Sequence, residues 1–284
     1  MGYNSTDMNN ISINDIHVPR SKSQIREGMI LMLDLNNGNI PEETEYVWYA
    51  CYGSNMNYSR FMDYVDRCAD KTPPVADGTF NFQQNIYFAK SASGWDDGGK
   101  AFLDDTCPGF AFGRIYKITR NQFMDIKCLE GRDYRRRLDL GTVAGLPVYS
   151  FTDQQKNYPE RMPSVRYFNT ILDGLAECYE GIEEKRALAK YLIKRILPGN
   201  TFQVVRAIRE NDHYLSNIEI SSRTEQSLSD VTAVVAWLVE HQVIQQDRRS
   251  VEAGHRLDDP QAYFFTTKGS CARELIDAMI KAMA

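Results

Sequence analysis

An aromatic, β-favouring segment that runs directly into a glycine loop narrows the range of folds open to this chain more than any other stretch. The run VWYACY at 47–52 precedes Gly53, and Ser54 and Asn55 complete the loop. Such a run is typical of a buried strand. Apolar residues then recur at helical spacing: Phe61, Met62, Val65 and Cys68. The segment therefore predicts a strand, a tight glycine loop and a helix in direct succession.

The loop itself, Tyr-Gly-Ser-Asn at 52–55, is the clearest local candidate for a binding site. A loop between a strand end and a helix start can point several backbone N–H groups into one spot, which favours an anion such as a carboxylate. Glycine lets the backbone approach a ligand without a Cβ in the way. An ordinary strand-to-helix turn, with Asn55 or Asn57 as the helix cap, is the alternative interpretation.

Composition excludes several classes of protein. The chain has 284 residues, of which 33 are Lys or Arg and 38 Asp or Glu, and the resulting charge of -5 argues against a protein that wraps a polyanion. No apolar run approaches the ~18 residues of a membrane span, and the first thirty residues lack the apolar core of a signal peptide. The six cysteines form no CxxC pair, so neither a zinc site nor a disulfide framework is indicated. We expect a soluble, cytoplasmic protein with reduced thiols and no membrane contact.

The chain is predicted to have three parts. Residues 1–44 form a polar arm with one apolar island at 29–35, residues 45–197 form the main domain, and residues 198–284 form a C-terminal module after Pro198 and Gly199. Within the main domain we expect strands at 79–90, 109–118, 133–140 and 145–152. A capping box of Thr119 and Gln122 starts a short helix that delivers Glu130 and stops at Gly131. Two further helices are expected, one from Val165 onward and one at about 182–196.

The C-terminal module has the element order of a winged helix. A strong helix at 229–242, two strands around a polar loop, and an amphipathic helix at 270–283 follow one another. Residues 198–284 contain nine Lys and Arg against twelve Asp and Glu, a net charge of 9 − 12 = −3, which is the wrong sign for binding phosphates. We therefore expect no nucleic acid here, but a second copy or another protein as partner. A C-terminal module that only packs against the main domain would have the same sequence pattern.

Four segments in order resemble one known family. They are the Tyr-Gly-Ser-Asn loop at 52–55, the Gly-Gly pair at 98–99 before Ala101, the stretch GFAFGRIYKITRNQFMDIKCLEG at 109–131, and Pro-Ser-Val-Arg-Tyr at 163–167. Together they resemble the gamma-glutamylcyclotransferase family over about residues 46–196. The resemblance implies an α+β fold, with a small, closed or nearly closed mixed β-barrel surrounded by helices. It also implies the cyclisation of a gamma-glutamyl amide to 5-oxoproline with release of an amine or amino acid.

The resemblance also implies roles for particular residues. Glu130 matches the catalytic glutamate, and a carboxyl group presented at a helix end in a walled site would have its pKa raised toward the working range. The N–H groups of Tyr52, Gly53, Ser54 and Asn55 would hold the substrate α-carboxylate. Tyr167 and Tyr134 would line the pocket, although Tyr134 follows Glu130 more closely than in some relatives. A small gamma-glutamyl substrate is implied, with no cofactor and no metal.

Several alternatives stay open at this point. Cys51, beside the loop, is either a small buried residue or a reactive thiol. A group of arginines after Glu130 is either a solvated strand edge or a site for an acidic leaving group: Arg132, Arg135, Arg136 and Arg137. A non-catalytic ligand-binding or sensor protein with a partner-binding module is the main alternative to an enzyme, and a DNA-binding regulator is the third. The substrate within the gamma-glutamyl class is not predicted.

Overall fold

The computed structural model describes residues 40, 44–153, 158–179, 182–197, 199–210, 215–240, 243–246, 263–265 and 270–284. Nearly all of the predicted polar arm, including its apolar island, lies outside the described residues. The chain divides into two compact units. The first comprises Met1–Lys90, Lys100–Arg161 and Thr170–Leu188, and the second comprises Ser91–Gly99, Met162–Asn169 and Ala189–Ala284. The domain boundary between 197 and 198 stays a prediction.

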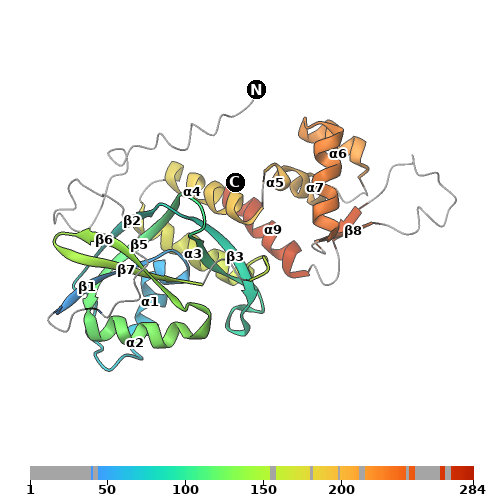
Figure 1. The fold of residues 1–284 in the computed structure, drawn as a ribbon. Helices are drawn as coiled ribbons and strands as arrows, with labels where there is room; N and C mark the ends of the chain where they lie inside the picture. Colours follow the sequence, from blue (N-terminus) through green and yellow to red (C-terminus); the bar gives the residue numbers. More distant parts are fainter. Residues whose placement is uncertain are drawn as a thin grey trace. The chain divides into compact units, whose positions relative to one another are not determined.

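A five-stranded sheet forms the centre of the first unit (Figure 1). Its strands, in spatial order, are β2 (Ala76–Phe82), β5 (Ala111–Thr119), β1 (Tyr46–Cys51), β7 (Leu146–Thr152) and β6 (Arg136–Val143). β1 pairs antiparallel with β5 and parallel with β7, and it is buried from Val47 to Cys51. A strand covered on both faces has a continuous apolar sequence, which is why the aromatic run predicts β1 correctly.

A second sheet contains β3 (Asn85–Ser91) and β4 (Gly99–Asp104). The single strand predicted at 79–90 is therefore wrong, because the chain bends at Gln83 and Gln84 and continues as β3. The bend is fixed by the Gln83 carbonyl, which accepts a hydrogen bond from the Gly109 N–H at 2.8 Å. Two consecutive glutamines interrupt the alternation of apolar residues, and this interruption was the signal for the turn.

The closed barrel implied by the resemblance is not observed. Among the described residues, β2 and β6 are the two edges of the five-stranded sheet, and β3 and β4 pair separately. Thr152, at the end of β7, joins the two sheets: its hydroxyl accepts the Leu103 N–H at 3.0 Å and donates to the Leu103 carbonyl at 2.8 Å. The predicted α+β class is confirmed. The two sheets are linked here by the Thr152 side chain, whereas in a closed barrel backbone hydrogen bonds between strands would link them.

Two helices cover one face of the sheet. α1 (Tyr58–Val65) and α2 (Arg120–Glu130) contact each other, and α2 also contacts β1 and β5 (Figure 1). The predicted capping box of Thr119 and Gln122 is present at the start of α2. Between α1 and the sheet, the buried ring of Phe61 from α1 stacks on that of Tyr116 from β5 with centroids 3.9 Å apart. The predicted helices later in the chain are α3 (Val165–Cys178) and α4 (Ile182–Ile196).

The second unit is mainly helical. It contains η2 (Ser93–Trp95), α5 (Thr201–Arg209), α6 (Asn217–Thr224), α7 (Leu228–Glu240), β8 (Ile244–Gln246), β9 (Tyr263–Phe265) and α9 (Ser270–Met283). β8 and β9 pair antiparallel. The sequence predicted α7, both strands and α9 but missed α5 and α6. The winged-helix assignment stays a prediction, and the polar loop between β8 and β9 lies outside the described residues.

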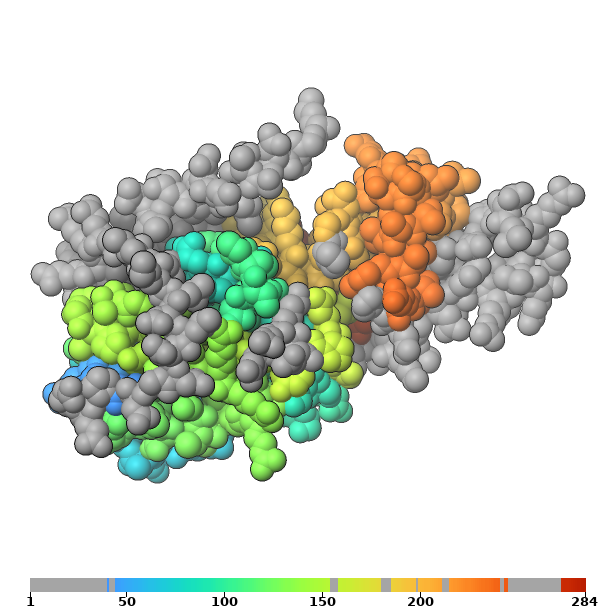
Figure 2. Space-filling view, viewed as in Figure 1, coloured from blue at the N-terminus to red at the C-terminus, as the bar shows by residue number. Residues whose placement is uncertain are grey.

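The surface of α7 has no positive charge of its own. The helix reads LSDVTAVVAWLVE, with Asp230 and Glu240 as its charged residues, and Leu228 and Val239 are exposed. In the space-filling view α6 and α7 form a broad orange surface (Figure 2).

Among the helices in the described part of the chain, none is long and apolar enough to span a bilayer.

Candidate functional site

The loop at 52–55 follows β1 and leads through a single 3-10 turn, η1 (Ser54–Met56), into α1. The turn is closed by hydrogen bonds from the Met56 and Asn57 N–H groups to the Gly53 and Ser54 carbonyls, at 3.0 and 3.1 Å. No acceptor among the described residues pairs with the N–H groups of Gly53, Ser54 or Asn55. The predicted strand, loop and helix are confirmed, and the loop has three backbone donors available to an anion.

Asn57 is the cap of α1, as the alternative interpretation proposed. Its side chain accepts the Arg60 N–H at 2.9 Å, and its backbone is extended. The helix cap and the loop with its backbone donors are therefore both present. The cap uses the side chain of residue 57, while the free donors belong to residues 53–55.

Two side chains from β5 and a backbone carbonyl of β7 hold the loop in place. The Tyr116 hydroxyl donates to the Asn55 carbonyl at 3.0 Å, and Arg114 Nη1 donates to the Met56 carbonyl at 2.9 Å. The Tyr52 hydroxyl donates to the Phe151 carbonyl at 2.6 Å. Arg114 and Tyr116 are both buried. The bonds from Arg114 and Tyr116 pair the carbonyl groups of Asn55 and Met56 and so fix the backbone at this end of the loop.

A second support comes from α3. Glu177 accepts the Tyr58 N–H at 2.9 Å and the Asn57 Nδ2–H at 2.7 Å, and it also pairs with Arg114 at 2.6 Å. Gly174, one turn earlier, lies against the loop so closely that a Cβ there would be 2.6 Å from the Met56 carbonyl carbon. The end of η1 and the start of α1 are thus clamped between β5 and α3.

Glu130 lies at the end of α2, as predicted, with Gly131 as the C-cap. Its Oε1 accepts hydrogen bonds from the Asn55 Nδ2–H at 2.8 Å and from the Tyr49 hydroxyl at 3.2 Å. Its Oε2 lies 3.5 Å from the Tyr64 hydroxyl. The donors come from the loop, β1 and α1, so the fold joins Glu130 to the loop at 52–55 across 75 residues of sequence.

The surroundings of Glu130 favour a carboxyl group that gains and loses a proton readily. Burial raises the pKa of Glu130 above the ordinary glutamate range. Hydrogen bonds from Tyr49 and Asn55 and the positive charges of Lys100 and Arg60 offset part of this rise in the pKa. Burial also raises the pKa of Tyr49, so its hydroxyl stays a proton donor to Glu130.

The raised pKa of Glu130 predicts a pH-dependent effect on stability. The folded state binds this proton more tightly than the unfolded state, so the free energy of unfolding falls as the pH rises from the ordinary glutamate range, about 4.3, through the folded pKa. Glu130→Gln removes the titration and keeps the hydrogen-bonding shape. We expect thermal unfolding to show the variant stabilised relative to wild type at pH 8, with the gain shrinking toward pH 4. A gain that is the same at both pH values would contradict the burial of the charge.

Tyr134 lies in an aromatic cluster of the first unit. Its ring stacks on Phe102 with centroids 4.8 Å apart, and its hydroxyl donates to the Ala101 carbonyl at 2.9 Å. Asp133, immediately before it, forms ion pairs with both Lys90 and Lys100. Burial raises the pKa of Asp133, but the hydrogen bonds from the two lysines outweigh this and leave the pKa below its usual range. The role of Tyr134 in substrate binding stays a prediction.

Tyr167 belongs to the second unit and is buried at the start of α3, with its ring 4.7 Å from that of Trp95. The two segments of the resemblance in this unit also meet. The Gly99 N–H donates to the Met162 carbonyl at 2.8 Å, and a Cβ on Gly98 would touch the backbone of Ser164. Glycine at 98 is therefore needed for close packing, and the pocket role of Tyr167 stays a prediction.

Burial decides the alternative for Cys51, and ion pairs account for two of the four arginines. Cys51 is buried, its thiol donates to the Arg114 carbonyl at 3.3 Å, and burial raises the thiol pKa, so it is a core residue and not a reactive thiol. Of the arginine group, Arg136 pairs with Asp105 and Arg137 with Asp139. These two arginines stabilise the edge strand β6 through acidic neighbours.

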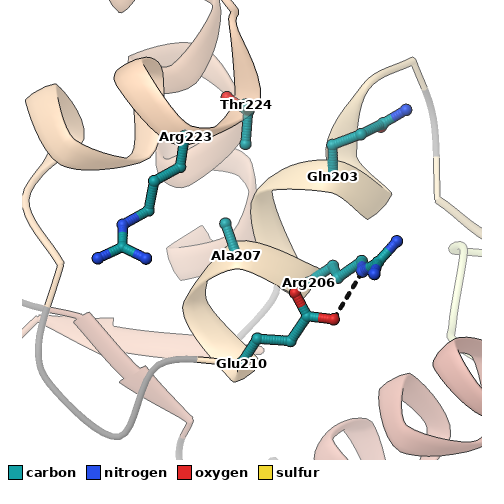
Figure 3. Close-up of a pocket in the computed structure, with 6 residues that line it drawn as sticks. All are labelled: Gln203, Arg206, Ala207, Glu210, Arg223 and Thr224. Carbon is teal, nitrogen blue, oxygen red and sulfur yellow. Dashed lines mark hydrogen bonds and ion pairs between the residues drawn. The ribbon is translucent and has the colours of Figure 1, made fainter.

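The second unit has a hollow of its own, of about 460 Å³, between α5 and α6 (Figure 3). It is lined by Gln203, Arg206, Ala207, Glu210, Arg223 and Thr224. Arg206 is paired with Glu210 at 2.7 Å, and Arg223 points from α6 away from this pair. The lining side chains are largely exposed, and they present no nucleophile or acid/base pair.

Sequence reasoning missed four side chains that shape the site: Tyr49, Tyr64, Arg114 and Glu177. The two tyrosines belong to apolar-looking runs, and their sequence suggests core packing. The signal for Arg114 was a charged residue inside the apolar strand 111–119, since a buried charge needs partners. Nothing local marks Glu177, which lies on the polar side of a regular amphipathic helix.

Comparisons with known proteins give weak likenesses. No protein-family model matches the chain. Over 102 residues it is 33% identical to histone deacetylase 5 from Arabidopsis thaliana, and it spans only 14% of the length of that protein and 28% of its own. Two solved structures are similar: a gamma-glutamyl cyclotransferase, with 18% identity and a TM-score of 0.40, and an uncharacterized protein from Homo sapiens, with 20% identity and a TM-score of 0.41. Each comparison covers 64% of this chain and 99% of the solved one, and the first bears the name of the family that the sequence motifs resemble.

Proposed function

We propose that the chain is a cyclotransferase that cleaves a gamma-glutamyl amide. The free α-amine of the substrate attacks its own γ-carbonyl carbon, the bond from that carbon to the departing nitrogen breaks, and 5-oxoproline and an amine or amino acid are released. The observation that carries the proposal is the part-buried carboxylate of Glu130, held by donors from three elements and bonded directly to the loop at 52–55.

Glu130 is the group proposed to move the protons. The attacking nitrogen enters as an ammonium group and must lose two protons to become the lactam N–H, and the departing nitrogen must gain two to leave as an ammonium ion. A single carboxyl group that acts as base and then as acid can carry each of these protons in turn. Such a group works best when its pKa lies near the working pH, and burial shifts the pKa of Glu130 in that direction. No step in this scheme needs a metal or a cofactor.

The loop is proposed to hold the substrate α-carboxylate. The N–H groups of Gly53, Ser54 and Asn55, which have no acceptor among the described residues, are the proposed donors for this anion. The resemblance implies the Tyr52 N–H as a further donor. Donors held in place by the bonds from Arg114 and Tyr116 need no reorganisation when the ligand binds. Tyr134 and Tyr167 stay candidates for substrate binding on the resemblance alone.

The function is tested by incubating the full chain with a panel of gamma-glutamyl amino acids, gamma-glutamylamines and glutathione. We expect 5-oxoproline and the free amine to appear in equal amounts from at least one compound. If a compound binds and is recovered unchanged, the chain is a ligand-binding or sensor protein, and the proposal of catalysis is wrong.

Lys100 is predicted to set the lower end of the pH range of this activity. Its positive charge lowers the pKa of Glu130, so Lys100→Gln should raise that pKa further. Because the first step needs the deprotonated carboxylate, the acidic limb of the kcat/KM profile should move to higher pH. Lys117→Gln is the matched control, since Lys117 lies over the Tyr46 ring and not among the charges that act on Glu130. An acidic limb that stays in place or moves to lower pH would refute this assignment.

A further inference from the structure

We infer that the side chain of Asn55 receives the α-amine of the substrate, with its carboxamide oxygen accepting an N–H of the amine while its nitrogen holds Glu130 alongside. This inference rests on the proposed function. It adds a recognition element, because the loop would then bind the whole α-amino acid head, carboxylate and amine together. The groups that carry it are Asn55, Glu130 and Tyr49.

The orientation of the Asn55 carboxamide is fixed by what it touches. Its Nδ2 lies 2.8 Å from Glu130 Oε1 and 3.2 Å from the Tyr49 hydroxyl. An ionised carboxylate can only accept hydrogen bonds, so the end of the amide that faces Glu130 must be the nitrogen. The oxygen is then the opposite end of the same planar group.

That oxygen is an unpartnered acceptor in a buried place. Asn55 is 5% exposed, and its Oδ1 is buried with no hydrogen-bond partner among the described residues. Buried polar atoms in native proteins are almost always paired, and an exception next to a functional group needs an explanation. The carboxylate of Glu130 already accepts hydrogen bonds from Asn55, Tyr49 and Tyr64, whereas the Asn55 oxygen accepts none among the described residues and is a further acceptor that a ligand can use. The missing partner must be a donor, which an amine or ammonium group supplies.

Donors and acceptor lie within one short segment. The N–H groups of Gly53, Ser54 and Asn55 suit an anion, and Asn55 Oδ1 suits a cation or an N–H donor. An α-amino acid in its zwitterionic form carries both charges on one carbon. The chemical class that fits the segment is therefore a free α-amino carboxylate, and compounds whose amine is absent or blocked should bind poorly.

The position also suits the chemistry. An amine bonded to Asn55 Oδ1 is next to the carboxylate that the other end of the same carboxamide holds. One N–H of the ammonium is held by Asn55, and another passes its proton to Glu130. The freed electron pair forms the bond to the γ-carbonyl carbon, and the proton on Glu130 goes to the departing nitrogen as its bond to carbon breaks. The new ring nitrogen then gives its second proton to the Glu130 carboxylate, and that proton passes to the released amine, which leaves as an ammonium ion. The groups facing Glu130 during these transfers are Tyr49 of β1, Tyr64 and Arg60 of α1, Asn55 of the loop and Lys100 of β4.

The test compares L-glutamate with glutarate, which differ only in the α-amine, as ligands of the full chain. By calorimetry or competition, wild type should prefer L-glutamate by about tenfold or more, the range of a hydrogen bond to a charged group. Asn55→Ala should bring this preference close to one while changing glutarate binding little, because the carboxylate donors are backbone groups. Asn55→Asp keeps an acceptor oxygen and adds a negative charge, so it should keep the preference for the ligand that carries an amine, although it removes the Nδ2–H donor to Glu130.

A control variant in the same experiment shows whether loss of any carboxamide changes the preference for L-glutamate. Asn85→Ala removes a carboxamide whose oxygen accepts the Phe110 N–H outside the site, and it should leave the preference unchanged. If Asn55→Ala retains the full preference for L-glutamate, or loses both ligands equally, the inference is wrong. The preference is measured without turnover, so it can hold even if no gamma-glutamyl compound yields 5-oxoproline, and the two proposals fail separately.

Discussion

Replacing Glu130 by glutamine is expected to lower the release of 5-oxoproline by about 10²–10⁴-fold, the range for loss of a general acid/base. Glutamine keeps the size of the side chain and an oxygen that can accept from Asn55 and Tyr49, so substrate binding should change far less than kcat. It cannot take a proton from the attacking ammonium or give one to the departing nitrogen. The measurement is steady-state kinetics on the most active compound of the panel.

Two further readouts separate a chemical effect from a structural one. Glu210→Gln makes the same change at a half-exposed position in the second unit, where Glu210 pairs with Arg206, and its kcat should match wild type. The far-ultraviolet spectrum and unfolding cooperativity of Glu130→Gln should also match wild type. Activity that survives the change in a folded protein would remove Glu130 from the mechanism and leave the carboxylate as a structural group.

The parts of the site that could be predicted from sequence are those encoded locally. The capping box of Thr119 and Gln122 sets the start of α2, and counting turns from there places Glu130 at its end. The aromatic run and Gly53 likewise define β1 and the loop. The pairing of loop and helix end was implied only by the resemblance, because it joins residues 75 positions apart.

Other elements were missed for identifiable physical reasons. α5 and α6 have nine and eight residues, too short for periodicity alone to separate them from loops. The capping box of Ser216 and Glu219 at the start of α6 was a readable signal. The second role of Asn55 has no sequence signal, because the unpaired state of one oxygen depends on how distant side chains surround it.

Replacing Gly174 by alanine is expected to disturb both stability and the site. In an open helix, alanine is favoured over glycine by about 1 kcal/mol. At this position of α3, however, the new Cβ would meet the backbone of Met56 and Asn57, and backbone atoms cannot rotate away as a side-chain end can. Overpacking of this kind costs about 1–3 kcal/mol or more, so the clash outweighs the gain in helix propensity. We expect the midpoint of thermal unfolding to fall by several degrees, at about 2–4 °C per kcal/mol for a domain of this size.

The displaced backbone is the one that supports the loop, so activity should fall more than the loss of stability alone explains. A shift of α3 away from η1 would weaken the bonds from Glu177 to Asn57 and Tyr58, and the N–H donors of residues 53–55 would lose their fixed position. The expected signature at a temperature where the variant is fully folded is a raised KM for the substrate. Gly94→Ala is the control, because a Cβ there has no atom within 4 Å and no such effect is expected. If Gly174→Ala unfolds at the wild-type temperature and keeps the wild-type KM, α3 does not position the loop, and the loop's geometry must then depend on the bonds from Arg114 and Tyr116 alone.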